Sequence, residues 1–142
     1  MTRNITVIAL AACLALSAGI ISCHKNEKQP LLASRIPGKW VKVRYATDDN
    51  ANSVLDEWEV HNVDAATTNT LQFKSDSTGV ESATGSPDLS FTWFITAEQS
   101  LSFAYNNSET TIFKITHINS GKLELTTKTK NGLVGYYYDR TE

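Results

Sequence analysis

The sequence is poor in the side chains on which most metal sites and nucleophilic enzymes rely. Its 142 residues include two cysteines and three histidines, and both cysteines, Cys13 and Cys23, lie near the N-terminus. The rest of the chain therefore has no disulfide bond and no thiolate metal ligand. It also lacks the H-x-x-x-H and H-E-x-x-H spacings of zinc sites and a glycine-rich phosphate loop. We therefore expect no metal and no cofactor.

An excess of positive charge is also missing. The chain has 13 Lys and Arg against 15 Asp and Glu, and Arg3 is the only charged residue before Cys23. The part of the chain that follows Cys23 is therefore acidic by three charges. This balance excludes a basic field large enough to hold nucleic acid.

The third absence is a nucleophile beside a base, which covalent catalysis requires. Beyond residue 35 the histidines are His61, in an acidic segment, and His117, which alternates onto the strand face of Phe113 and Ile115. A histidine on an apolar face is more often structural than catalytic, so we predict that the protein is not an enzyme and has no catalytic residue. An enzymatic alternative would use His61 with nearby acids, and it requires these groups to converge in a cleft.

The N-terminus has the pattern of a targeting segment. Residues 1–4 carry one positive charge, residues 5–21 are uncharged and apolar, and the chain becomes polar directly after Cys23. An apolar run that ends in small residues and a cysteine resembles the lipobox of bacterial lipoproteins, here Ile20-Ile21-Ser22-Cys23. The resemblance implies a signal peptide at 1–22, cleavage before Cys23, and membrane anchoring through lipid on that cysteine. Two or three acyl chains, at about 0.8 kcal/mol per buried CH₂, hold a protein firmly.

Three alternatives remain for this segment. It could be an uncleaved membrane helix, although it is near the short limit of about 17 residues. It could be a plain secretory signal, or Leu10-Ala11-Ala12-Cys13 could be the lipobox. Cleavage at Cys13 would leave the apolar LALSAGII at the new N-terminus, so Cys23 is favoured. Residues 24–35 have mixed charge and no periodicity, so residues 23–35 are predicted to be the lipidated cysteine and a flexible tether.

From residue 36 onward, apolar residues alternate with a period of two. At 89–95 the odd-numbered positions are Leu, Phe, Trp and Ile, and at 101–105 they are Leu, Phe and Tyr. A period of two indicates strands with one buried face, since a helix would scatter these rings around its circumference. The side chains expected to face inward are Leu71, Phe73, Phe91, Trp93, Ile95, Leu101, Phe103, Leu123 and Leu125.

We expect eight strands joined mostly by short turns, with one domain at 36–142. The first strand is predicted at 40–45, with Val41, Val43 and Tyr45 on one face, and Asn131-Gly132 predicts a hairpin before the last strand. Closing eight antiparallel strands on themselves removes both exposed edges. The predicted fold class is therefore an all-β, eight-stranded antiparallel up-and-down barrel.

The order of the segments resembles the small lipocalin-like lipoproteins of Gram-negative bacteria over roughly residues 34–142. Gly38-Lys39-Trp40 matches the G-x-W that opens the first lipocalin strand, and after a long connection follow LQFKSDSTG, FTWFIT, LSFAY, IFKITHI, KLELTTKT and a tyrosine-rich strand. The resemblance implies a lipocalin-like barrel, structural roles for Gly38 and Trp40, and packing of Arg140 over Trp40. It also implies a lipid-anchored location in the bacterial cell envelope, at the outer membrane.

Such a scaffold implies a small apolar or amphipathic ligand in the barrel mouth. The candidate ligand-binding residues are Phe73, Phe91, Trp93, Phe103 and Tyr105. The alternative is a filled barrel without a ligand, in an envelope protein that has a structural role or meets a partner protein. That alternative predicts an exposed patch at Trp58 or at the tyrosines 136–138.

Residues 46–69 form a long connection with six acidic residues and no lysine or arginine. Asp48, Asn50, Asn52, Asp56 and Glu59 match positions 1, 3, 5, 9 and 12 of a calcium-binding loop. Position 6, however, is Ser53 instead of glycine, and a strand, not a helix, precedes the loop. The sequence favours a solvated acidic segment anchored under the barrel edge by Trp58 and Val60.

Overall fold

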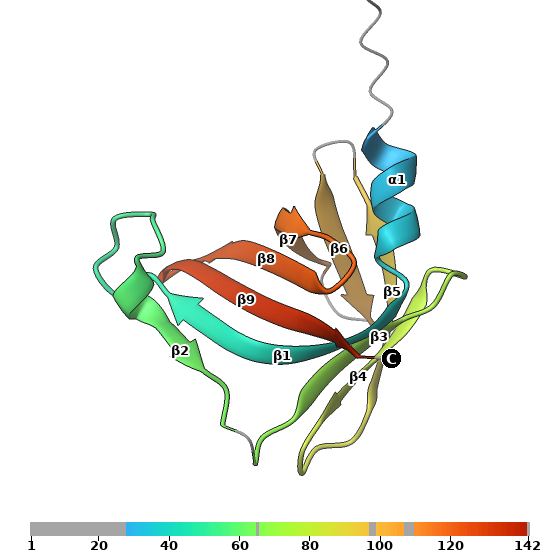
Figure 1. Cartoon of the computed structure of the whole chain (residues 1–142), viewed down its shortest axis with the longest axis horizontal. Coiled ribbons are helices and arrows are strands. Elements are labelled where there is room, and N and C mark those ends of the chain that lie inside the picture. Colours follow the sequence, from blue (N-terminus) through green and yellow to red (C-terminus); the bar gives the residue numbers. More distant parts are fainter. Residues whose placement is uncertain (1–27, 65, 97–98, 107–109, 142) are drawn as a thin grey trace, which may run out of the picture.

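The computed structural model describes residues 28–64, 66–96, 99–106 and 110–141 (Figure 1). The predicted signal peptide and Cys23 lie outside these described residues. The described part begins with helix α1 and continues as strands, with one short 3₁₀-helix, η1. The elements are α1 (Lys28–Arg35), β1 (Gly38–Thr47), η1 (Glu57–Glu59), β2 (Val60–Asn62), β3 (Asn69–Phe73), β4 (Thr78–Ala83), β5 (Leu89–Ile95), β6 (Ser100–Tyr105), β7 (Thr111–Ile118), β8 (Lys122–Thr129) and β9 (Gly132–Thr141).

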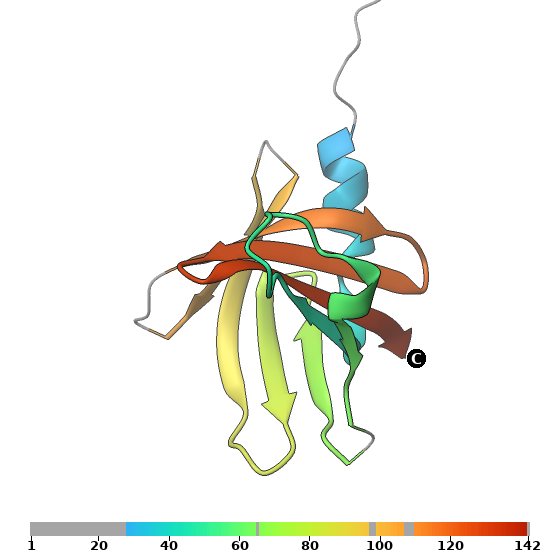
Figure 2. The same cartoon turned by 90° about the vertical axis from the view of Figure 1, so that its left-hand side faces the viewer.

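The strands form one closed antiparallel barrel. Each of β3 to β8 pairs with the next strand along the chain, and β1 pairs with both β3 and β9, which closes the circle. The short strand β2 extends the sheet beside the second half of β1. Figures 1 and 2 show that the barrel is flattened, with β8, β9 and β1 crossing over β3, β4 and β5. The predicted eight-stranded up-and-down barrel is confirmed, and β2 is an addition to it.

Apolar side chains fill the interior from α1 to the middle of the barrel. All nine residues predicted to face inward belong to this core, with Ile95 partly buried and the others buried. The Phe73 ring centroid lies 5.4 Å from that of Phe91, 5.6 Å from that of Trp93 and 5.5 Å from that of Phe103. Because each buried ring or aliphatic side chain contributes about 1.5–3 kcal/mol, this core is the main source of stability.

Trp40 closes the end of the barrel next to α1. Its indole N–H donates a hydrogen bond to the carbonyl oxygen of Ile36 at 2.8 Å, and both side chains are fully buried. The guanidinium carbon of Arg140 lies 4.3 Å from the Trp40 ring centroid, and Arg140 donates a hydrogen bond to the carbonyl oxygen of Pro37 at 3.1 Å. A Cβ at Gly38, where φ is +142°, would lie 2.8 Å from Arg140 Nη1. The G-x-W segment and Arg140 thus pack together at this end of the barrel, which is the packing that the resemblance implied for Arg140.

The prediction of a flexible tether is wrong for residues 28–35. These residues form α1, and Leu32 packs against the core beside Ile36. Pro30 lies in the first turn of the helix, where its missing N–H removes no intrahelical hydrogen bond. Eight residues are too few to show a helical period, and the helix is held by its contact with the barrel instead.

Two β-bulges change which side chains face inward. The bulge between Lys42 and Arg44 places Tyr45 opposite the inward-facing Tyr136, so Tyr45 does not share a face with Val41, and the prediction that it does is wrong. The bulge between Ile115 and His117 places His117 on the outer face, opposite Glu124. Alternation alone groups Tyr45 with Val41, and His117 with Ile115. Both groupings fail because one extra residue in a strand inverts the alternation beyond it.

Replacing Arg140 by leucine should destabilise the barrel. The change removes the cation–π contact with Trp40 and the hydrogen bonds to the carbonyl groups before β1. We expect a decrease of about 1–3 kcal/mol in the free energy of unfolding, measured by urea denaturation with tryptophan fluorescence.

The matched control for this variant is Arg44→Leu. The Arg44 guanidinium carbon lies 4.9 Å from the Tyr137 ring centroid, on the outer surface of the barrel. Its removal should lower the free energy of unfolding by no more than about 0.5–1 kcal/mol. Equal losses in the two variants would contradict the closing role of Arg140.

Candidate functional site

The end of the barrel opposite α1 is open to solvent. Leu89 and Tyr45 face inward, because they pair with Glu81 and Tyr136 respectively, yet they are 54% and 41% exposed. An inward-facing apolar side chain stays exposed only where the interior meets solvent. We call this end, at the start of β5 and the end of β1, the mouth of the barrel (Figure 2).

Polar side chains form the floor of the mouth. The Glu81 carboxylate accepts a hydrogen bond from the Asn69 side-chain amide at 3.0 Å and another from the Tyr105 hydroxyl. The Lys42 ammonium nitrogen lies 5.2 Å from the Tyr136 ring centroid. Burial raises the pKa of Tyr105 far above its ordinary value, and the hydrogen bond and charge of Glu81 raise it further. Burial lowers the pKa of Lys42, and the negative charge of Glu81 opposes this shift.

A groove of about 510 Å³ opens beside this floor. It combines two carboxylates, two hydroxyl groups and an amide with one exposed leucine. An arrangement of this kind can hold a small molecule that has both apolar surface and hydrogen-bond donors. The lining residues are Glu81, Asp88, Leu89, Ser90, Tyr105 and Asn106.

The structure places the five predicted ligand-binding residues in two groups. Phe73, Phe91, Trp93 and Phe103 are almost fully buried and pack on one another below the floor. Tyr105 lies above them and lines the groove. The four buried rings therefore form the base of the mouth, and contact between a ligand and any of these five residues stays a prediction.

Sequence reasoning missed Glu81 and Lys42 as residues of the mouth. Glu81 faces inward because it pairs with Leu71 on β3 and with Leu89 on β5. Lys42 faces inward because it pairs with Tyr138 on β9. Once the register between strands is known, a charged residue that pairs with buried apolar residues is clearly recognised as inward-facing. Alternation within one strand does not provide this register.

Two buried carboxylates organise the acidic connection. Glu59 is fully buried, and its oxygens accept hydrogen bonds from three backbone N–H groups of the connection, at 2.8, 3.4 and 2.9 Å. Asp48 is also buried and accepts two more, at 3.0 and 2.9 Å. Leu55 packs on Gly135, where a Cβ would lie 2.6 Å from Leu55 Cδ1. Residues 48–59, which we call the acidic loop, are therefore compact and fixed against β9.

The residues of the calcium-loop spacing are engaged with one another and with the backbone. The Asn50 and Asn52 side-chain amides donate hydrogen bonds to the Asp56 carboxylate at 3.1 and 3.2 Å. Within the ranges that the structure describes, no group of three or more His, Cys, Asp or Glu side chains is arranged to hold a metal ion. The oxygens of the acidic loop thus serve its own N–H groups.

The prediction that Trp58 anchors the connection is wrong, because this side chain is 63% exposed. The buried position belongs to Glu59, one residue later, and Val60 is half-buried. His61 is exposed on β2, with its ring centroid 5.3 Å from that of Tyr45. His117 is exposed on β7, and its Nε2 lies 3.0 Å from the Asn119 amide nitrogen. The two histidines thus lie outside the groove.

Comparison with known proteins gives no family. No family model matches the chain, and no curated protein matches it. Among solved structures, the chain is similar to apocrustacyanin C2 at 16% identity and a TM-score of 0.46, over 81% of this chain and 65% of that one. It is similar to lobster apocrustacyanin A1 at 13% identity and a TM-score of 0.43, over 80% of this chain and 69% of that one.

The chain therefore spans about two thirds of the length of each of these two proteins. In the part of the chain that the structure describes, no helix is long and apolar enough to cross a membrane.

Replacing Glu59 by alanine should destabilise the acidic loop and the barrel edge beside it. The change leaves three backbone N–H groups without their acceptor, and we expect a decrease of about 2–4 kcal/mol in the free energy of unfolding. Urea denaturation measures this decrease, and hydrogen exchange locates it in the loop.

The control is Glu57→Ala, which removes an exposed carboxylate from the same 3₁₀-helix. It should change the free energy of unfolding by no more than about 0.5 kcal/mol. If Glu59→Ala behaved like Glu57→Ala, the proposed organisation of the loop would be incorrect.

Proposed function

We propose that this protein is a lipoprotein of the bacterial cell envelope whose lipocalin-like barrel binds a small amphipathic ligand in its mouth. The lipobox that ends at Cys23 supports anchoring by lipid, and the outer membrane is the proposed location. The observation that carries the binding function is the mouth itself, where Leu89 and Tyr45 face inward yet stay exposed above a polar floor.

The filled interior limits the size of the proposed ligand. Below the floor, the ring centroids of Phe91 and Phe103 are 5.1 Å apart, so this depth is occupied by side chains. A ligand would therefore lie in the mouth and the groove, with its apolar part against Leu89 and Tyr45. Its polar part would meet Glu81, whose carboxylate accepts hydrogen bonds and favours a ligand group that donates them.

A second function has its own supporting observation. Trp58 is 63% exposed and Val54 is 54% exposed, and both lie on the acidic loop that Glu59 and Asp48 hold in place. Apolar side chains presented by a fixed loop suit a protein interface, because little ordering entropy is lost on binding. In this alternative, the barrel is a filled scaffold, and a partner protein docks at Trp58.

Native mass spectrometry of the full-length protein, purified as it is produced and released gently from detergent, tests the ligand proposal. We expect an added small-molecule mass on the wild type. Leu89→Ser should reduce the bound fraction roughly fivefold to tenfold, because it removes the apolar wall of the groove.

Ile112→Ser is the matched control, since Ile112 is 57% exposed but lies on the outer face of the barrel. It should leave the bound fraction unchanged. A wild-type protein that carries no added mass, and that also takes up none from an extract of the host envelope, would contradict the ligand function and favour the filled scaffold.

Lipidation should depend on Cys23. After expression in a Gram-negative host with a clickable fatty-acid analogue, the wild-type protein should carry the label and sediment with the membranes. Cys23→Ser should lose the label, because it lacks the thiol that takes the lipid.

Cys13→Ser is the control for this experiment and should keep both the label and the membrane location, since Cys13 lies in the segment removed with the signal peptide. Persistent labelling of Cys23→Ser, or loss of label from Cys13→Ser, would refute the assignment of the lipobox.

A further inference from the structure

An apolar patch lies on the outer face of β5, β6 and β7. Phe94 is 50% exposed and Ile112 is 57% exposed. Both pair with Ser102 on the strand between them, so the three side chains are neighbours on one face. Ser102 is fully buried beneath its neighbours, and its hydroxyl has no hydrogen-bond partner among the described residues. The solvent face of a barrel strand is usually polar, so this patch requires an explanation.

The patch lies on the side of the barrel that carries α1 (Figure 1). A groove of about 740 Å³ runs between α1 and β5, and its lining includes Ala33, Phe94 and Ile95. Helix α1 begins at Lys28, five residues after Cys23, and five residues span at most about 17 Å. A lipid on Cys23 would therefore hold this side of the barrel close to the bilayer surface.

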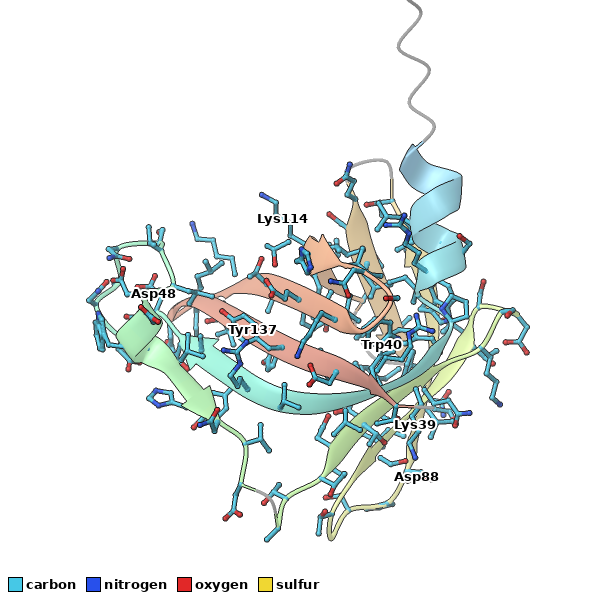
Figure 3. All side chains as sticks on the ribbon, viewed as in Figure 1. Lys39, Trp40, Asp48, Asp88, Lys114 and Tyr137 are labelled. Atoms are coloured by element: carbon cyan, nitrogen blue, oxygen red, sulfur yellow. The ribbon has the colours of Figure 1, made fainter. Side chains whose placement is uncertain are left out.

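Two exposed cations, Lys114 and Arg35, favour the same orientation. Lys114 follows Ile112 by two residues on the same outer face and is exposed (Figure 3). Arg35 is exposed at the end of α1. The acidic loop lies at the opposite side of the molecule in Figure 1, and Asp88 lines the groove of the mouth. Exposed cations on the side of the proposed anchor can meet anionic lipid headgroups.

We propose that the patch formed by Phe94, Ser102, Ile112 and Lys114 rests on the membrane surface. Phe94 and Ile112 insert between the headgroups and the acyl chains, and Lys114 meets lipid phosphate groups. The inference rests on the proposed anchoring at Cys23 and adds a defined orientation to it. In this orientation, the acidic loop faces the solution and the mouth lies at the barrel end away from α1.

Depth-dependent fluorescence quenching tests this orientation. The full-length lipoprotein is reconstituted into vesicles of phosphatidylethanolamine and phosphatidylglycerol that contain a nitroxide-labelled lipid. Phe94→Cys or Ile112→Cys provides one free thiol for a fluorophore, because Cys13 is removed with the signal peptide and the Cys23 thiol is acylated. We expect the lipid nitroxide to quench labels at 94 and 112 several-fold more than a label at Val54→Cys.

Val54 is a matched control because it is 54% exposed, close to the values of Phe94 and Ile112, but lies on the acidic loop. Equal quenching at the three positions in protein that floats with the vesicles would overturn the orientation and leave the anchor intact. Failure to float would refute the anchor itself, and with it this inference. Cross-linking between copies through position 94, without lipid quenching, would assign the patch to a second copy and would also overturn the proposal.

A charge reversal tests the role of Lys114. Lys114→Glu should reduce quenching at position 94 in vesicles with phosphatidylglycerol and should have little effect in vesicles of phosphatidylcholine alone. Lys39→Glu, which changes an exposed lysine on the outer face of β1, far from Lys114 in Figure 3, is the control and should change neither value. Identical effects of the two reversals would contradict a specific contact of Lys114 with lipid phosphate.

Discussion

The pairing of β1 with β9 is the constraint on which the rest of the structure depends. Without it, the sheet would have two open edges and no enclosed interior. The first half of β1 pairs with β3, and nearly all of its length pairs with β9, so one strand completes the circle. The same strand carries Trp40, which Arg140 from the end of β9 covers. The pairing that closes the barrel and the Trp40–Arg140 contact that seals one end therefore come from the same two strands. All inward side chains must share the one narrow interior that results.

That interior has two halves with different chemistry. The half near α1 is filled by rings in mutual contact, which is what a small barrel needs for stability. The other half keeps Glu81, Lys42 and Tyr105 at inward positions, where apolar residues of similar volume would pack without a desolvation penalty. Beside them, the buried side-chain oxygen of Asn69 accepts no hydrogen bond from the residues that the structure describes. Folding alone does not require this polar floor, and the proposed recognition of a ligand would give it a physical reason.

The alternation of apolar and polar residues was sufficient to predict the strands, the barrel and the core, because a period of two indicates a strand with one buried face. It failed where a local feature inverts the pattern without changing composition. The bulges in β1 and β7 inverted the faces of Tyr45 and His117. At the acidic loop, hydrophobicity favoured Trp58 as the anchor, but Glu59 is buried because only a carboxylate accepts three N–H bonds there. The polar floor depends on register between strands, which no single strand encodes.

The proposed orientation and the proposed ligand site constrain each other. If the side of α1 faces the bilayer, the mouth samples the aqueous compartment, and a ligand must reach it through water. This favours a short amphiphile over a membrane lipid with long acyl chains, in agreement with the shallow depth left above Phe91 and Phe103. The carboxylates of Glu81 and Asp88 at the groove would concentrate cationic or hydrogen-bond-donating molecules and disfavour anionic ones. The barrel would thus take its ligand from solution while its opposite side stays at the membrane.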